Sequence, residues 1–259
     1  MKKLLLTTAF ALSCIGVSAQ QTLTLSTYKG TDLEKYAGQT LNVSISRYLF
    51  NQWNTLSLPF AMSAEQVDEV FGSDCKLEKL VGVENDGLNV KLNFQNCKKE
   101  GIKPNTPYIL YYAGESGSKK FVVENAQIIK GTPQLVYTAE GSGETVIMSG
   151  AQTHLDSEGL YGILAKNNGE AAFVNVDEAT NGFYATRCYV KMSKGNSTLL
   201  KTNHIDEDVT GVTSIVKKGE RVDVYNLSGM TVAKQVTVDD IQRMQKGTYV
   251  TKGKTFLIK

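Results

Sequence analysis

Short runs of alternating apolar and polar residues, separated by turn residues at intervals of roughly 8–12 positions, fill most of this sequence. The chain contains 23 glycines but only 4 prolines, and many of the runs are rich in Thr, Val and Tyr. β-Branched and aromatic residues favour strands. We therefore predict an all-β protein with a β-sandwich-like two-layer core, one or two short helices and a small C-terminal β module.

Changes in composition predict how the chain is divided. We expect an all-β main domain over residues 20–203, either as one unit or as two lobes that meet near 115–120. The acidic segment "HIDEDV" lacks the spaced aspartates of a calcium loop, so we expect it to begin a linker over residues 204–215. A separate small β module then occupies residues 216–259.

The N-terminus predicts the compartment. Two lysines precede an apolar stretch over residues 4–17, and small residues at 17–19 offer a cleavage site. This pattern is typical of a secretory signal peptide, here residues 1–19. A lipoprotein signal would have to use Cys14, but the apolar stretch continues past it. No later run reaches the ~20 apolar residues that a transmembrane helix needs. We expect a secreted or outer-membrane surface-associated protein with no transmembrane segment in the mature chain.

Charge and motif content argue against several functional classes. The net charge is +2 and no basic stripe stands out, so we expect no nucleic-acid partner. The two histidines, His154 and His204, lack H-E-x-x-H or C-x-x-C spacing, so we expect no metal site. A G-x-S-x-G elbow is also absent from the sequence. We predict no catalytic residues and no cofactor, although two carboxylates alone would suffice for a glycosidase.

The segment "WNTLSLPF", residues 53–60, contains the only tryptophan of the chain. Strand alternation predicts two different faces for it. One face carries Leu56, Leu58 and Phe60, and the other carries Trp53, Thr55 and Ser57. Pro59 has no N–H to donate and is expected to end the strand. A short helix with Ser63 as its N-cap and Gly72 at its end should follow.

Trp53 on the polar face of this strand is a candidate binding residue. Together with Tyr48, Tyr111 and Tyr112 in neighbouring strands, it could form an aromatic platform for a sugar ring or a partner chain. The alternative, which we favour for Trp53, is that it packs against a second layer of the sandwich. Both faces of a sandwich strand can be covered by other elements.

Three cysteines remain after removal of the signal peptide: Cys75, Cys97 and Cys188. Cys75 and Cys97 lie at equal distances from the hairpin turn at Asp86, and we predict a disulfide between them, which an exported protein allows. Matching the apolar faces of the hairpin leaves the two cysteines one residue out of register, so the bridge needs a bulge near Gln95. The alternative is two unpaired, half-buried thiols. Cys188 lies on an apolar strand face and is expected to be a buried thiol.

Four segments carry a resemblance to a known group of proteins. They are "YAGQTLNVSISR", "WNTLSLPF", "IKPNTPYIL" and "FYATRCYVKM", which fall discontinuously within residues 36–192. Together they resemble a recurrent all-β module of Bacteroidetes-type secreted surface proteins, in which a tryptophan strand ends in Leu-Pro-Phe. The resemblance implies a location outside the cytoplasm, and it brings no catalytic motif with it.

The tail carries a second resemblance. "VYNLSG", "GTYV" and the final lysine-rich strand are similar to the C-terminal sorting domain associated with type IX secretion. The tail departs from that pattern by inserting "VTVDDIQRMQ", residues 236–245, which we expect to form a helical turn. The resemblance implies the export machinery as a partner of this module.

These observations lead to one favoured function. We expect a non-catalytic secreted or cell-surface protein that acts as a binding or adhesion module for a glycan or a protein partner. A structural component of envelope assembly is the alternative, and a glycan-degrading enzyme is a less favoured one.

Overall fold

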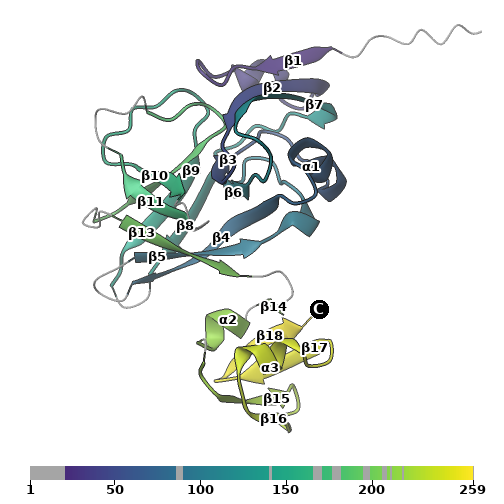
Figure 1. Ribbon diagram of the computed structural model, residues 1–259, viewed down its shortest axis with the longest axis vertical. Helices are drawn as coiled ribbons and strands as arrows, with labels where there is room; N and C mark the ends of the chain where they lie inside the picture. The colour runs from purple at the N-terminus through teal and green to yellow at the C-terminus, as the bar shows by residue number, and fades with distance from the viewer. Residues whose placement is uncertain are drawn as a thin grey trace, which may run out of the picture.

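The computed structural model describes residues 21–85, 90–139, 142–165, 171–176, 182–194, 199–205, 209–210, 212–217 and 219–258. The predicted signal peptide, residues 1–19, lies outside the described residues. Within these ranges the chain is mostly β-strand and forms three sheets, with few and short helices (Figure 1). The prediction of an all-β fold is therefore confirmed.

The small N-terminal sheet has the strand order β1-β2-β7. Its strands are β1 (Thr22–Leu25), β2 (Thr40–Leu49) and β7 (Gly117–Gln127). β1 runs parallel to β2, whereas β7 is antiparallel to it. Between β1 and β2 lies the 3₁₀-helix η1 (Leu33–Tyr36), which the side chain of Asp32 caps. The lobe boundary considered near 115–120 falls at the start of β7, a strand that pairs with β2.

The large sheet, in the described part of the chain, has the strand order β3-β6-β4-β5-β13-β11-β10-β12-β9-β8. Its strands are β3 (Trp53–Leu56), β6 (Tyr108–Tyr111), β4 (Lys76–Asn85), β5 (Val90–Asn96), β13 (Leu199–Ile205), β11 (Ala171–Asn175), β10 (Tyr161–Ala165), β12 (Cys188–Met192), β9 (Thr145–Gly150) and β8 (Gln134–Thr138). Neighbours pair in antiparallel fashion, except that β13 runs parallel to β5. β13 thus joins the two halves of the large sheet.

Two buried clusters hold these layers together. The first lies between the small N-terminal sheet, helix α1 (Ala64–Phe71) and one face of β3, β4 and β6. The second is enclosed by the curled large sheet and takes side chains from most of its strands. β3 stands between the two, because Leu56 belongs to the first cluster and Trp53 to the second. Burial on both sides explains why the two faces of "WNTLSLPF" differ as the alternation predicts, and it gives the core its two layers.

Helix α1 forms where the sequence places it. The side chain of Ser63 accepts the backbone N–H of Gln66 at 3.2 Å, and the side chain of Gln66 accepts the backbone N–H of Ser63 at 2.9 Å. Such a capping box satisfies two N–H groups that a helix leaves without partners. Gly72 ends the helix with a φ of 91°. Phe71 is buried, with its ring edge on Phe121 of β7 at 5.4 Å, and this contact fastens α1 to the small N-terminal sheet.

The hairpin of β4 and β5 does not form the predicted disulfide. A bulge that changes the register is present, but it lies on β4 between Leu80 and Gly82. Past this bulge the backbone N–H of Cys97 donates to the carbonyl of Leu77 at 2.8 Å, so Cys97 lies opposite Leu77 and not opposite Cys75. The two cysteines are separate buried thiols in the first cluster. The predicted bridge is wrong because Cys75 and Cys97 face the same cluster but do not lie opposite each other in the hairpin.

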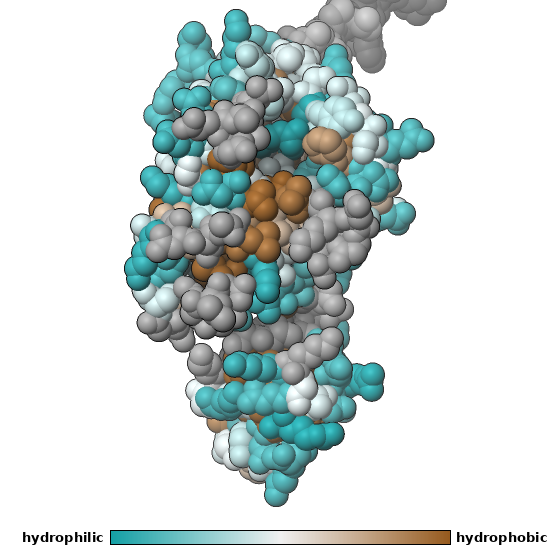
Figure 2. Space-filling model, turned by 60° about the vertical axis from the view of Figure 1, so that its left-hand side comes forward, coloured by the Kyte–Doolittle hydropathy of each residue, from teal (hydrophilic) through white to brown (hydrophobic). Residues whose placement is uncertain are grey.

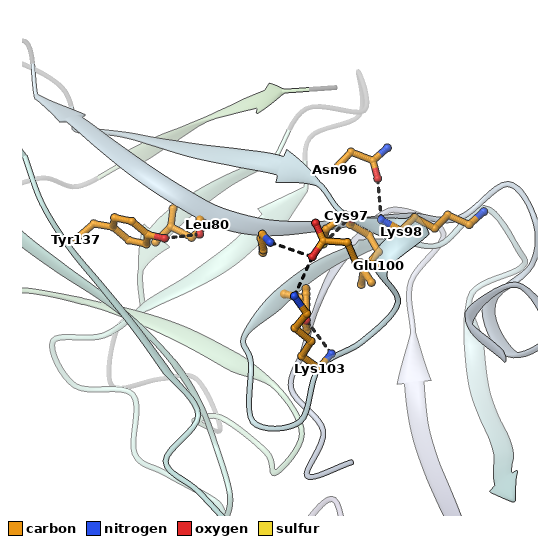
Figure 3. Close-up of polar contacts among 10 residues, drawn as sticks. Leu80, Asn96, Cys97, Lys98, Glu100, Lys103 and Tyr137 are labelled. Carbon is orange, nitrogen blue, oxygen red and sulfur yellow. Dashed lines mark hydrogen bonds and ion pairs between the residues drawn. The ribbon is translucent and has the colours of Figure 1, made fainter. Parts of the chain in front are cut away.

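Figure 3 shows the turn that follows Cys97, the 3₁₀-helix η2 (Lys98–Glu100). Oε2 of Glu100 accepts from Nζ of Lys103 at 3.0 Å and from Nζ of Lys79, on β4, at 3.2 Å. These lysines, Lys103 first, hold the pKa of the Glu100 carboxyl below its usual value. The contacts fasten the turn to β4 and so keep Cys97 in its register.

The C-terminal sheet has the strand order β14-β18-β17-β15-β16 and its own buried cluster. Its elements are β14 (Val209–Thr210), α2 (Val212–Ile215), β15 (Val222–Asn226), β16 (Thr231–Val236), α3 (Val238–Gln242), β17 (Gly247–Thr251) and β18 (Lys254–Ile258). Helix α3 forms within the inserted segment 236–245, where a helical turn is predicted. Lys252 and Gly253 connect β17 to β18 with φ angles of 49° and 73°. Two positive φ angles are what a two-residue type I′ hairpin turn requires.

The predicted linker over residues 204–215 is longer than the structure allows. His204 belongs to β13, which pairs with β5 in the large sheet. On the other side, Val212 of α2 is fully buried in the C-terminal cluster, and β14 pairs with β18. Only residues 206–208 between these strands lie outside the described residues, together with residue 211. The connection between the two sheets is therefore short.

The surface is mainly hydrophilic. Figure 2 shows apolar residues gathered in the middle of one face of the main body, above a C-terminal part that is mostly hydrophilic. Within the described ranges, no helix has the length and apolar character that crossing a lipid bilayer requires.

Candidate binding site

The structure keeps Trp53 and Tyr111 in contact inside the large sheet, but it places Tyr48 on another sheet and Tyr112 against the first cluster. Trp53 is only 5% exposed. Its indole stacks on the imidazole of His204 with the ring centroids 4.7 Å apart, and it makes an edge contact with the ring of Tyr111 with the centroids 5.5 Å apart. Tyr112 is partly buried against the first cluster. Tyr48 lies on β2 in the other sheet and is 43% exposed. Trp53 is therefore buried in the cluster enclosed by its own large sheet, and of the four residues only Tyr48 borders the cavity described next.

Strand β2 carries a charged residue on its core-facing side. Leu41, Val43, Ile45 and Leu49 alternate along one face and are buried. Arg47 occupies the next position of this same series and is only 5% exposed. An apolar residue is expected at such a position, because a buried charge without a partner of opposite sign costs several kcal/mol. Arg47 therefore needs a structural or functional explanation.

The guanidinium of Arg47 is held by backbone carbonyls. Nη2 donates to the carbonyl of Thr55 at 2.7 Å, and Nη1 donates to the carbonyl of Thr186 at 3.2 Å. Among the described residues, the Nε–H has no hydrogen-bond partner. A second arginine, Arg187, lies beside it and donates from Nη2 to the carbonyl of Tyr48 at 3.0 Å. Two guanidinium groups are thus fixed next to each other by neutral acceptors.

The positive charge of this pair is not balanced by an ion pair within the described residues. No carboxylate in the described part of the chain forms an ion pair with Arg47 or Arg187. Burial, and after it the charge of Arg187, lower the pKa of Arg47. A guanidinium begins from so high a pKa that it stays charged at neutral pH. In the described part of the chain, the site therefore holds two like charges that no carboxylate pairs with.

Thr186, between these arginines, has a strained backbone. Its φ is 70°, a region that β-branched residues rarely adopt. Hydrogen bonds impose this conformation: its N–H donates to the carbonyl of Ala151 at 2.9 Å, and its own carbonyl accepts from Arg47 and from the N–H of Ser57. Its hydroxyl is buried without a hydrogen-bond partner among the described residues. Strain of this kind is concentrated at binding and catalytic sites.

A cavity of about 400 Å³ opens in front of these groups. We call it the arginine–tyrosine cavity. Its wall includes Tyr28, Arg47, Tyr48, Tyr184, Thr186 and Arg187, with the small polar side chains Thr27, Ser46 and Ser118. Tyr28 is 62% exposed, so the cavity is open to solvent. The ring of Tyr28 lies 5.6 Å from that of Tyr184 and 5.7 Å from that of His154, which forms an aromatic rim.

Cysteine chemistry does not fit the described residues near this cavity. Cys188 follows Arg187 directly, is 1% exposed and donates its backbone N–H to the hydroxyl of Thr55. Burial raises the pKa of its thiol to about 12, so the thiol is protonated at neutral pH and a poor nucleophile. The described ranges also contain no group of three His, Cys, Asp or Glu side chains that could hold a metal ion.

The sequence contains a signal for this site that the platform hypothesis does not use. In "TLNVSISRYL" the core-facing positions run Leu, Val, Ile, Arg, Leu, and the arginine breaks an otherwise apolar series. The partner Arg187 gives no comparable signal, because it comes from a loop distant in sequence.

No protein-family model, no curated protein and no solved structure matches this chain. The function of the site must therefore be inferred from its own chemistry.

Proposed function

We propose that this chain is a non-catalytic secreted or cell-surface binding protein, and that a glycan enters the arginine–tyrosine cavity. The signal-like N-terminus, the resemblance to secreted surface modules and the sorting-like tail support the location. The tail would engage the export machinery. The cavity supports the binding role.

One observation carries this proposal: tyrosine rings and hydrogen-bonding groups line a single cavity of about 400 Å³. Cavities of roughly 300–1,000 Å³ are typical of small-ligand sites. The flat faces of Tyr28 and Tyr184 suit the C–H face of a sugar ring, while phenol and hydroxyl groups suit its hydroxyls. A protein partner of large flat contact area fits this recessed shape less well.

The lining residues favour binding over hydrolysis. A glycosidase needs two carboxylates on either side of the bond to be cleaved. None of the described residues that line the cavity is Asp or Glu. The less favoured enzyme alternative would therefore have to use another part of the molecule.

The test is a glycan array followed by titration calorimetry on the best ligand. Tyr28→Ala removes an exposed rim residue, so the fold should be kept, and we expect about tenfold weaker binding because an aromatic contact is lost. Tyr112→Ala is the control: it changes a predicted platform residue that does not line the cavity, and affinity should stay the same. Loss of binding in Tyr112→Ala but not in Tyr28→Ala would place the glycan at the predicted aromatic platform and not in the cavity. Absence of any glycan binding by the intact protein would favour the envelope-assembly alternative.

A further inference from the structure

We propose that Arg47 and Arg187 bind an oxyanion, the carboxylate or sulfate group of an acidic glycan, at the floor of the arginine–tyrosine cavity. The identity of the ligand as a glycan rests on the function proposed above. The presence of an anion site does not, since it follows from the charges and hydrogen bonds of this chain alone.

The first argument is charge. Arg47 is buried at a core-facing position, and Arg187 beside it adds a second positive charge. None of the described carboxylates forms an ion pair with either arginine. An anion entering the cavity would meet the buried guanidinium of Arg47, so its attraction there would be stronger than at an exposed arginine.

The second argument is geometry. Carbonyls of Thr55 and Thr186 hold the guanidinium of Arg47 in one orientation before any ligand binds. The buried Nε–H of Arg47 and the buried hydroxyl of Thr186 both lack partners in the described part of the chain. Such groups are expected to be satisfied by a ligand or water. A planar guanidinium fork matches the two oxygens of a carboxylate or sulfate better than any neutral group.

The third argument concerns the kind of molecule that carries the anion. A peptide could bind by adding a strand beside the end of β2 that extends past β1, which would need unpaired carbonyls there. The carbonyl of Ser46 already accepts from the Thr27 hydroxyl at 3.1 Å, and the carbonyl of Tyr48 accepts from Arg187. The cavity therefore offers side chains and rings rather than a strand edge, which suits a sugar.

The direct test needs no variant. The intact protein is titrated with a panel of acidic oligosaccharides, each paired with its neutral form, in which the uronate is methyl-esterified or the sulfate removed. The panel also contains a peptide with a free C-terminal carboxylate and the same peptide as its amide. We expect at least one acidic oligosaccharide to bind, and its neutral partner to bind at least tenfold more weakly.

Variants then locate the anion. Arg187→Gln should weaken binding of the acidic oligosaccharide at least tenfold, and should reduce the difference in affinity between the acidic oligosaccharide and its neutral partner. Arg187→Lys keeps the positive charge but loses the planar guanidinium, so its affinity for the acidic oligosaccharide should lie between that of the intact protein and that of Arg187→Gln. Arg221→Gln is the control, because Arg221 also donates to a backbone carbonyl but lies in the C-terminal sheet. If Arg187→Gln fails to fold, the comparison of acidic and neutral forms on the intact protein still decides the question.

The outcomes separate the two proposals. Equal affinity for acidic and neutral oligosaccharides would overturn the anion site and leave the glycan-binding function standing. Binding of the free-acid peptide alone, weakened by Arg187→Gln, would support the anion site and overturn the glycan as its source. Failure of every acidic compound to bind, while a neutral oligosaccharide binds, would overturn the anion site alone. Failure of every oligosaccharide, acidic or neutral, and of the free-acid peptide to bind would overturn both proposals.

Discussion

Nδ1 of His204 lies 2.6 Å from Oε2 of Glu78, so that β13 is tied to β4 across the intervening strand β5. Glu78 is 3% exposed. The other ring nitrogen, Nε2, lies 3.1 Å from the hydroxyl of Thr202, and that hydroxyl donates its single hydrogen to the carbonyl of Ala171. The ring also stacks on Trp53, so one histidine connects three strands of the large sheet.

This contact predicts a measurable coupling between the two residues. His204→Ala removes the hydrogen-bond partner of a buried carboxylate, and we expect a loss of about 1–3 kcal/mol in the free energy of unfolding. A double-mutant cycle with Glu78→Gln in urea should give a coupling energy of about 1 kcal/mol or more. If the losses in unfolding free energy of the two single variants simply add in the double variant, the contact between His204 and Glu78 does not stabilise the fold.

The thiols give a second prediction. A chain that begins at Gln20 contains Cys75, Cys97 and Cys188, all of them buried. Alkylation of the unfolded protein without any reductant should modify three thiols, and alkylation of the folded protein should be slow. Mass spectrometry checks both. A linked pair of peptides containing Cys75 and Cys97 would contradict the register seen at Leu77.

Alkaline pH should destabilise the fold through Cys188. Burial raises the pKa of this thiol to about 12 in the folded state, above the ~8.5 of an exposed thiol. A folded pKa above the unfolded one means that the contribution is complete below pH ~8.5 and is lost as pH rises toward 12. We expect a slope of about 1.4 kcal/mol per pH unit from this group between pH 9 and 11.

Cys188→Ala tests the origin of that slope. Buried tyrosines such as Tyr108, whose pKa is also raised to about 12 by burial, contribute in both proteins and cancel in the comparison. The alkaline slope of the variant, measured by urea unfolding at several pH values, should be smaller by about 1.4 kcal/mol per pH unit. Parallel slopes would show that the Cys188 thiol ionises without cost.

Strain at Thr186 predicts a substitution that stabilises the protein. Glycine adopts a φ of 70° without penalty, so Thr186→Gly relieves strain and removes a buried hydroxyl. After the entropy that glycine adds to the unfolded chain, we expect a net gain of about 1 kcal/mol in unfolding free energy. Thr138→Gly on strand β8 is the control and should lose about 0.5–1 kcal/mol. Destabilisation by Thr186→Gly would mean that the threonine side chain makes a contact that outweighs the strain.

The C-terminal sheet predicts the behaviour of a truncated chain. It has its own buried cluster, and the last strand of the large sheet, β13, ends at Ile205 before the C-terminal sheet begins. Deleting residues 206–259 should leave the melting transition of the main body unchanged, because no strand of its sheets is lost. If the tail is an export signal, the truncated protein should accumulate in the periplasm. Arrival of the truncated protein at the cell surface would refute the sorting role, and unfolding would refute the independence of the two parts.

The sequence predicts best those features that depend on neighbouring residues. The capping box of Ser63 and Gln66, and the turn at Lys252, are set by contacts within a few positions of the chain. The sequence cannot show that β13 pairs with β5, because this depends on a choice among many compatible strand edges. The same limit applies to Cys97, whose partner changed with the position of one bulge.

The candidate site, too, can be predicted from the sequence only where it depends on neighbouring residues. The exposed side of β2, with Tyr48, follows from alternation, and Arg47 stands out as a charge on the opposite, apolar face. The meeting of Arg47 with Arg187 depends on how the large sheet curls back toward the small one, which brings Thr186 to β2. Patterns of alternation carry no information on such curling. The curl also encloses Trp53, whose burial we favour from the sequence over an exposed platform.

The position of β13 has a consequence for the order in which the protein is made. In the described part of the chain, it is the last strand of the large sheet to emerge from the ribosome, yet it lies between β5 and β11. Until Ile205 is synthesised, those two strands face a gap, and the nascent chain cannot close its largest sheet. The late strand therefore makes closure of the largest sheet one of the last steps in the folding of the main body, after every other described strand of that sheet has been made.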